Sequence, residues 1–190
     1  MSLTQERYEK WVNHPNLDAR YKDVLENMNE EEKNDAFYTL IEFGTAGMRG
    51  LLGPGTNRIN IHTIRKATQG YANYIIAAGK EACEKGIAIG YDNRHMSREL
   101  AFDCADLLAK NNIRSYVFES LRPTPELIFA VRHLGCFGGI MITASHNPKE
   151  YNGYKVYDER GCQLITKLAQ IVIDQVAEID DYLDIDTKLN

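Results

Sequence analysis

The sequence lacks several features that mark common classes of protein. Its 190 residues include only 4 cysteines, and no two of these stand in a C-x-x-C spacing. Zinc knuckles and dithiol redox pairs are therefore excluded, and an even count alone does not make a disulfide framework. No basic-then-apolar leader opens the chain, and the uncharged stretch near residues 71–79 is too short to span a bilayer. We expect a cytoplasmic protein with no membrane partner.

An excess of basic residues is also missing. The 22 lysine and arginine residues are outnumbered by 27 aspartate and glutamate residues, which gives a formal net charge of -5. Because nucleic-acid backbones are bound mainly through clustered basic side chains, nucleic acid is not an expected partner. An anionic ligand would have to be held by a few individually placed groups, since the net charge would not attract it.

What is present is the composition of a folded globular chain. Hydrophobic residues make up 44% of the sequence and charged residues 26%. The length suits one ordinary domain with a sizeable core. Residues 1–40 are highly charged and predict helices, which we interpret as an N-terminal extension packed on a main domain of residues 41–190.

Patterns of apolar residues alternate along the main domain. Helical spacing predicts a helix capped by Asn60, one capped by Ser97, one that starts at Pro123 and a last one over residues 164–179. Short apolar runs predict strands over residues 87–91, 113–118, 137–143 and 153–157. This alternation is typical of a three-layer α/β/α fold, with a mixed, mostly parallel sheet of about four strands. The last two strands are too close in sequence for a helical crossover, so we expect them to be antiparallel.

The loop after the third predicted strand carries the strongest local signal. It reads T-A-S-H-N-P-K-E-Y-N-G-Y-K over residues 143–155 and places Ser145 directly before His146. A serine hydroxyl is a weak nucleophile unless a base or a cation assists it, and Lys155 on the next strand can point back towards it. Asn152-Gly153 permits a positive φ that would fix the loop. From these residues alone, a catalytic serine and a plain polar turn are about equally supported.

The loop closely resembles the phosphoserine loop of the α-D-phosphohexomutases, the phosphoglucomutase and phosphomannomutase family. Two further segments occur in the family's order: residues 44–50, G-T-A-G-M-R-G, resemble its G-T-[AS]-G-[LM]-R-G element, and residues 90–94, G-Y-D-N-R, are similar to its G-x-D-x-R turn. By itself the first of these segments would be interpreted as a simple turn, because glycine-rich loops are weak motifs. The resemblance covers roughly residues 40–180.

The resemblance implies a role for each matching residue. Ser145 matches the serine that is phosphorylated in the resting enzyme and passes its phosphoryl group to a sugar phosphate. His146 and Lys155 match groups that act in acid–base chemistry or stabilise charge, and Arg49 matches the arginine that faces the reactive phosphate. Such residues suit phosphoryl transfer, in which charge spreads over three oxygens and cationic donors do most of the work.

Two other residues of these segments are weaker candidates. Thr45 and Arg94 are candidate substrate- or phosphate-binding residues. For Arg94, however, a supporting salt bridge or hydrogen-bond network with Asp92 is the preferred interpretation. The isolated histidines are expected to be surface or packing residues: His62, His95 and His133.

The resemblance also implies parts that this sequence does not contain. The family has four domains around one cleft, and its D-G-D-x-D-R metal loop, G-E-x-S-G sugar loop and R-x-S-G-T phosphate loop are absent here. We therefore expect the first domain of such an enzyme, inactive alone, with the remaining domains as partners. Mg²⁺ would bind the phosphate on Ser145 and three carboxylates from elsewhere. The acidic residues near the end are expected to form a solvated face or a linker: Asp180, Asp181, Asp184 and Asp186.

The expected reaction interconverts glucose 1-phosphate and glucose 6-phosphate through glucose 1,6-bisphosphate. A phosphomannomutase or a phosphopentomutase is the alternative within the family, because the sugar-recognition loop lies outside this sequence. Two alternatives from other classes stay open. One is a hydrolase that uses Ser145 and His146, which would need a third residue to orient the histidine. The other is a non-catalytic module that binds sugar phosphates.

Overall fold

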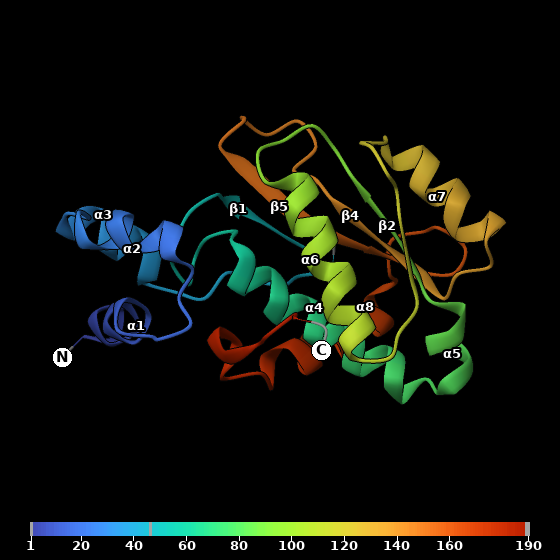
Figure 1. Cartoon of the computed structure of the whole chain (residues 1–190), viewed down its shortest axis with the longest axis horizontal. Helices are drawn as coiled ribbons and strands as arrows, with labels where there is room; N and C mark the ends of the chain where they lie inside the picture. Colours follow the sequence, from blue (N-terminus) through green and yellow to red (C-terminus); the bar gives the residue numbers. More distant parts are fainter. Residues whose placement is uncertain (1, 46, 189–190) are drawn as a thin grey trace.

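A computed structural model of the chain describes residues 2–45 and 47–188 (Figure 1). Ala46, which belongs to the glycine-rich segment, lies outside the described residues. Five strands form one sheet in the order β1-β5-β4-β2-β3 among the described residues. They are β1 (Met48–Leu51), β2 (Ile87–Tyr91), β3 (Ser115–Val117), β4 (Gly138–Ile142) and β5 (Tyr151–Tyr157). Strand β2 pairs in parallel with β3 and β4, whereas β5 is antiparallel to both β4 and β1.

Helices cover both faces of this sheet. In chain order they are α1 (Leu3–Val12), α2 (Ala19–Glu26), α3 (Glu30–Phe37), α4 (Ile61–Ala77), α5 (Lys80–Lys85), α6 (Ser97–Lys110), α7 (Thr124–His133) and α8 (Thr166–Ala177), followed by a short 3₁₀ turn. One face packs against α4 and α6, and α8 lies against α4. The other face packs against α7. The helices α1–α3 gather at one end of the molecule (Figure 1).

The expected three-layer α/β/α fold with a mixed sheet is confirmed, and the last two strands are antiparallel as predicted. The sheet has five strands instead of about four, and its four neighbour pairs divide equally between parallel and antiparallel. The additional strand is β1, which lies within the glycine-rich segment and has no apolar run of its own. Its conformation comes from pairing with β5, an interaction between residues about a hundred positions apart.

The helix starts show where local sequence rules held and where they did not. Asn60 caps α4 as predicted, with its side chain accepting a hydrogen bond from the Thr63 backbone N–H in a capping box. Ser97 was expected to cap the next helix, but the cap position is Met96, which has a left-handed φ of 63°. The Ser97 hydroxyl instead donates to Asp92, 2.8 Å away. The Ser97 side chain therefore bonds to the loop before the helix and does not cap the helix.

Two glycines allow β1, β5 and the end of β4 to approach one another closely. A Cβ on Gly47, whose φ is +92°, would lie 1.9 Å from the Tyr154 carbonyl oxygen. A Cβ on Gly153 would lie 2.6 Å from the Met48 carbonyl oxygen and 2.8 Å from that of Thr143. No side chain fits at either position. Gly153 is thus needed for proximity and not for a positive φ, which in this loop falls on Ser145 instead.

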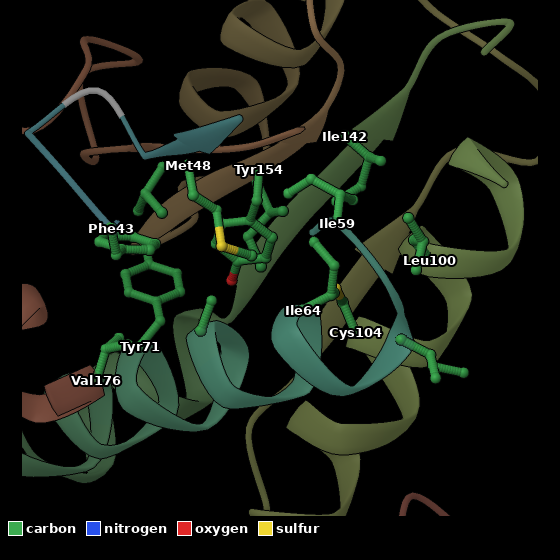
Figure 2. Packing of buried hydrophobic residues seen from close by; sticks show 14 of the residues in the cluster. Phe43, Met48, Ile59, Ile64, Tyr71, Leu100, Cys104, Ile142, Tyr154 and Val176 are labelled. Carbon is green, nitrogen blue, oxygen red and sulfur yellow. The ribbon is translucent and has the colours of Figure 1, made fainter. Parts of the chain in front are cut away.

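The main core lies between the sheet and α4. Phe43, Met48, Tyr71 and Tyr154 are buried within it, together with aliphatic side chains of the central strands (Figure 2). The N-terminal helices contribute to the same cluster, since Trp11 is only 1% exposed. Helices of the extension over residues 1–40 therefore pack on the main fold, while the boundary between the extension and the main domain stays a prediction.

The acidic C-terminal residues do more than form a solvated face. Asp181 lies 3.4 Å from the Lys10 ammonium and Asp184 lies 3.5 Å from the His14 ring, so both contact the first helix or the residues just after it. The Trp11 indole N–H also donates to the Tyr182 hydroxyl, at 3.1 Å. Exposed ion pairs contribute little stability each, so the buried aromatic contact is the main link between the two ends of the fold.

No helix among the described residues combines the length and the apolar character that crossing a bilayer requires.

The three isolated histidines occupy surface or packing positions, as expected. His133 stacks on Phe129 with 5.2 Å between ring centroids, His95 is exposed, and His62 is buried beside Trp11 and Tyr21.

His62 makes the folded state sensitive to acid. Its Nε2 accepts a hydrogen bond from the Asp18 backbone N–H at 3.3 Å, and its Nδ1 has no hydrogen-bond partner among the described residues. Burial lowers the pKa of His62 from 6.5 to about 4, the positive charge of Arg65 adds to this effect, and Asp18 opposes it. The ring is therefore neutral in the folded chain at neutral pH.

We predict that the free energy of unfolding decreases as the pH falls from 6.5 to 4 because of His62. In that window the unfolded chain binds a proton that the folded chain does not, so acid favours unfolding by at most about 3 kcal/mol. Urea unfolding at pH 7, 5.5 and 4 measures the slope. A His62→Gln variant removes the titrating ring and should flatten the slope; equal slopes in the two proteins would contradict the prediction.

Candidate active site

The reactive loop connects β4 to β5 at the edge of the sheet. Strand β4 is buried along its whole length, and the chain emerges from it at Thr143. Ser145 follows on the surface with a left-handed φ of 55°. Its Oγ accepts a hydrogen bond from the Lys155 Nζ, 2.7 Å away. The structure therefore brings together two of the predicted residues, with the ammonium directly on the candidate nucleophile.

The position of Lys155 follows from its place on β5. Side chains alternate between the two faces of a strand, and the buried Tyr154 and Val156 point into the core, so Lys155 lies on the opposite face. Half-burial lowers the pKa of Lys155 from its usual value, and the neighbouring charge of Arg49 lowers it further, whereas Asp92 acts in the other direction. A lysine with a lowered pKa gives up its proton more readily than a solvated one.

Arg49 reaches the same loop from β1. The register pairs Arg49 with Gly153, which places its side chain on the same face of the sheet as Lys155. Its Nη1 donates a hydrogen bond of 2.8 Å to the Asn147 side-chain oxygen. Arg49 is otherwise exposed, so its guanidinium adds a second positive charge close to Ser145.

Arg94 binds the loop itself. Its Nη1 donates to the carbonyl oxygens of Pro148 at 2.8 Å and Tyr151 at 3.0 Å. Its Nη2 donates to those of Ser145 at 2.8 Å and Asn147 at 2.7 Å. The Nε lies 3.3 Å from the Asp92 carboxylate, which confirms the predicted supporting salt bridge. The four N–H donors of Nη1 and Nη2 thus bond to loop carbonyl oxygens, and Nε lies against Asp92, so the geometry favours a supporting role over direct phosphate binding.

Two candidates are not brought into contact with Ser145 in this structure. His146 is exposed and makes no hydrogen bond or ion pair among the described residues. Thr45 is exposed in a tight turn that is closed by paired backbone hydrogen bonds between Gly44 and Gly47. Their assigned roles stay predictions.

An open depression of about 260 Å³ lies beside the serine. It is lined by Asp92, Asn93, Arg94, His95, Ser145, Asn147 and Lys149. Within the described part of the chain, no three His, Cys, Asp or Glu side chains gather to hold a metal ion. The nearby Asp92 carboxylate is already bonded to protein groups.

Comparison with known proteins agrees with this geometry. Residues 40–183 match the sequence profile described as "Phosphoglucomutase/phosphomannomutase, alpha/beta/alpha domain I". The chain belongs to this family. The match includes Ser145, Lys155 and the two segments that carry Arg49 and Arg94. The resemblance inferred from the sequence motifs is thus confirmed.

The relatives are much longer than this chain. A phosphoglucomutase from Staphylococcus aureus strain MRSA252 is 42% identical over 182 residues, which cover 96% of this chain and 32% of that protein. The corresponding protein of strain USA300 is 41% identical over the same length. This member of the phosphoglucomutase/phosphomannomutase family therefore spans about a third of the length of the curated relatives that it matches.

Solved structures give the same result for the fold. One from Thermus thermophilus, provisionally described as a phosphomannomutase, aligns with a TM-score of 0.65 and 31% identity over 73% of this chain and 30% of its own. The open form of a Paramecium phosphoglucomutase (parafusin) aligns with a TM-score of 0.60 over 74% of this chain and 27% of its own. At 23% identity, the second comparison shows the fold alone.

Sequence reasoning assigned no role to two residues of the loop. Asn147 carries the contact with Arg49, and the Thr143 hydroxyl accepts a hydrogen bond from the Ser145 backbone N–H at 3.0 Å. Both residues belong to the T-A-S-H-N motif, so the motif marked the segment correctly. What each side chain does depended on the residues that the fold places opposite it.

We predict that Arg94→Lys loosens the reactive loop. A lysine cannot reproduce four bonds to carbonyl oxygens and an ion pair with Asp92, so the free energy of unfolding should decrease by about 2 kcal/mol. Amide hydrogen exchange over residues 143–151 should accelerate as well. The exposed Arg98 on α6 provides a matched control, because Arg98→Lys should change stability by about 0.5 kcal/mol or less. Equal effects of the two substitutions would refute the assigned role.

Proposed function

We propose that this domain carries the phosphoserine of a phosphohexomutase. Ser145 would hold the phosphoryl group in the resting enzyme and exchange it with a hexose phosphate. The observation that supports this most directly is the 2.7 Å contact between the Lys155 ammonium and Ser145 Oγ, in a chain of this family. A phosphoserine carries close to two negative charges and is stabilised by cations of this kind.

In the proposed step the bond between phosphorus and Ser145 Oγ breaks while a sugar hydroxyl oxygen forms a bond to the same phosphorus. Negative charge develops on Oγ, where Lys155 stabilises it and delivers a proton. His146, exposed beside Ser145, is the proposed group that takes the proton from the sugar hydroxyl. Arg49 would stabilise the charge on the transferring phosphoryl group. The reverse step returns a phosphoryl group to Ser145.

The complete reaction needs parts outside this chain. Glucose 1,6-bisphosphate is the proposed intermediate and activator, and the remaining domains of the same enzyme are the proposed partners. Mg²⁺ would supply further charge neutralisation, bound to the phosphate on Ser145 and to three carboxylates proposed to come from the remaining domains. Glucose phosphate is the proposed substrate, with the family's mannose and pentose phosphates as alternatives.

Two alternatives from other classes have distinct tests, and the geometry does not favour the first of them. A Ser–His hydrolase needs its histidine on the serine hydroxyl, yet the partner of Ser145 Oγ is Lys155. Stoichiometric labelling of Ser145 by a serine-reactive phosphonate would restore that alternative. A module that only binds sugar phosphates would never become phosphorylated on Ser145.

We predict that Ser145 takes up one phosphate. Incubation of the chain with glucose 1,6-bisphosphate and the separately prepared remaining domains, followed by intact-mass and peptide analysis, should locate the phosphate on Ser145. Ser145→Ala should abolish the uptake, whereas Ser120→Ala, at an exposed serine away from the loop, should leave it unchanged. Phosphate on another residue, or none in the complete system, would contradict the proposed function.

We also predict that the 190-residue chain alone shows no mutase turnover. The family's metal loop and sugar-recognition loop are not in this sequence, so glucose 1-phosphate should not be converted even with Mg²⁺ and glucose 1,6-bisphosphate. A coupled assay for glucose 6-phosphate measures the rate, with addition of the remaining domains as the positive control. Robust turnover by the purified chain would overturn the view that this domain is only part of the active site.

A further inference from the structure

Ser145 has a backbone conformation that is unfavourable for its residue type. Its φ of 55° lies in the left-handed region, which costs an L-residue other than glycine roughly 1–2 kcal/mol. Serine in this region persists only where the surrounding structure fixes it. In this conformation the Ser145 side chain points to Lys155, with Oγ 2.7 Å from the ammonium. The groups that enforce it therefore position the candidate nucleophile.

Both peptide groups of Ser145 are held by side chains. The N–H donates to the Thr143 hydroxyl at 3.0 Å, and the carbonyl oxygen accepts from Arg94 Nη2 at 2.8 Å. Fixing the peptide on each side of a residue leaves its φ and ψ little freedom. Neither contact involves the Ser145 side chain, which stays available for chemistry.

The two contacts depend on one carboxylate. The Thr143 hydroxyl donates to Asp92 Oδ2 at 2.6 Å, and Arg94 Nε lies 3.3 Å from the same oxygen. The sheet register explains why they meet, since it pairs Tyr91 with Ile142 in neighbouring parallel strands. The residues that follow, Asp92 and Thr143, leave the sheet side by side.

Asp92 is itself fixed from the opposite side. Its Oδ1 accepts hydrogen bonds from the Ser97 hydroxyl at 2.8 Å and from the Arg94 backbone N–H at 3.0 Å. Ser97 in turn accepts from the amide of Asn152, a fully buried residue on β5, at 2.9 Å. The carboxylate thus has a single orientation, and both of its oxygens have partners.

We propose that Asp92 is a positioning residue that holds Ser145 in its left-handed conformation through Thr143 and Arg94. The carboxylate orients the Thr143 hydroxyl so that its lone pair faces the Ser145 N–H, and it aligns the guanidinium that binds the Ser145 carbonyl. Asp92 does not touch the reacting atoms. The loop is therefore preorganised before any phosphate or sugar is bound, and phosphoryl transfer needs no backbone rearrangement at the serine.

The test compares Thr143→Val with Thr143→Ser in the unphosphorylated chain. Valine has nearly the same shape as threonine but no hydroxyl, whereas serine retains the hydroxyl. Backbone coupling constants and the Cα and Cβ chemical shifts of Ser145 report its φ directly. We expect Thr143→Val to lose the left-handed signature and to speed exchange of the Ser145 amide about fivefold to tenfold. Thr143→Ser should restore both, and Asp92→Asn should weaken both by removing the charge that aligns Arg94.

Thr56→Val is the matched control. Thr56 is also buried, and its hydroxyl also donates a 2.6 Å hydrogen bond, in its case to the backbone carbonyl oxygen of Thr39, outside the reactive loop. This variant should lower the unfolding midpoint as much as Thr143→Val does, while leaving the Ser145 signature unchanged. An unchanged signature in either Thr143→Val or Asp92→Asn would overturn the proposal, and so would the same change in Thr56→Val.

The relevance of this inference to phosphoryl transfer rests on the proposed function. The result of the experiment does not depend on that function. The signature of Ser145 is measured without phosphate, sugar or further domains. A chain that shows the expected signatures and never takes up phosphate would refute the phosphoserine proposal and leave the positioning network intact. A chain that takes up phosphate on Ser145, but whose Ser145 signature does not respond to the Thr143 and Asp92 substitutions, would support the phosphoserine proposal and refute the positioning network.

Discussion

The close pairing of β5 with β4 on one side and β1 on the other is the constraint on which the site depends. Strand β5 runs back antiparallel after the reactive loop, so Lys155 returns to Ser145, ten positions earlier in the chain. Strand β1 brings Arg49 to the same face. Glycine at positions 47 and 153 permits this spacing, because any side chain there would collide with a neighbouring backbone carbonyl. The close approach of these strand backbones is therefore what brings the side chains of the site together.

The positive charge around Ser145 is local and differs in sign from the net charge of the chain. The chain carries a net charge of -5, yet the exposed face around Ser145 presents Arg49, Lys149 and Lys155. The nearby Asp92 carboxylate is turned inward and accepts hydrogen bonds from protein groups on both oxygens. Positive charge is thus concentrated at one place without making the whole protein basic. These exposed cations differ from Arg94, whose guanidinium bonds to carbonyl oxygens of the loop.

Much of the fold was predictable because its signals are local. The buried runs of β2 and β4 and the capping box at Asn60 are read from a few consecutive residues. Strand β1 was not predictable, since Met48–Leu51 has no alternation of its own and becomes a strand only by pairing with β5. The C-terminal aspartates were expected to be solvated, and Asp181 and Asp184 are exposed, but their ion pairs with the first helix and the residues after it depend on how the two ends of the chain meet.

The sequence by itself determined the α/β layers, the family and the segment that holds the candidate nucleophile, because periodicity and contiguous motifs need no distant partner. Tertiary structure decided which side chain serves Ser145. The adjacent His146 is exposed on a turn, and the antiparallel return of β5 delivers Lys155 instead. It also decided that Arg94 and Asp92 hold the loop. Those roles arise from the register of β2 against β4, which joins segments fifty residues apart and which no local pattern encodes.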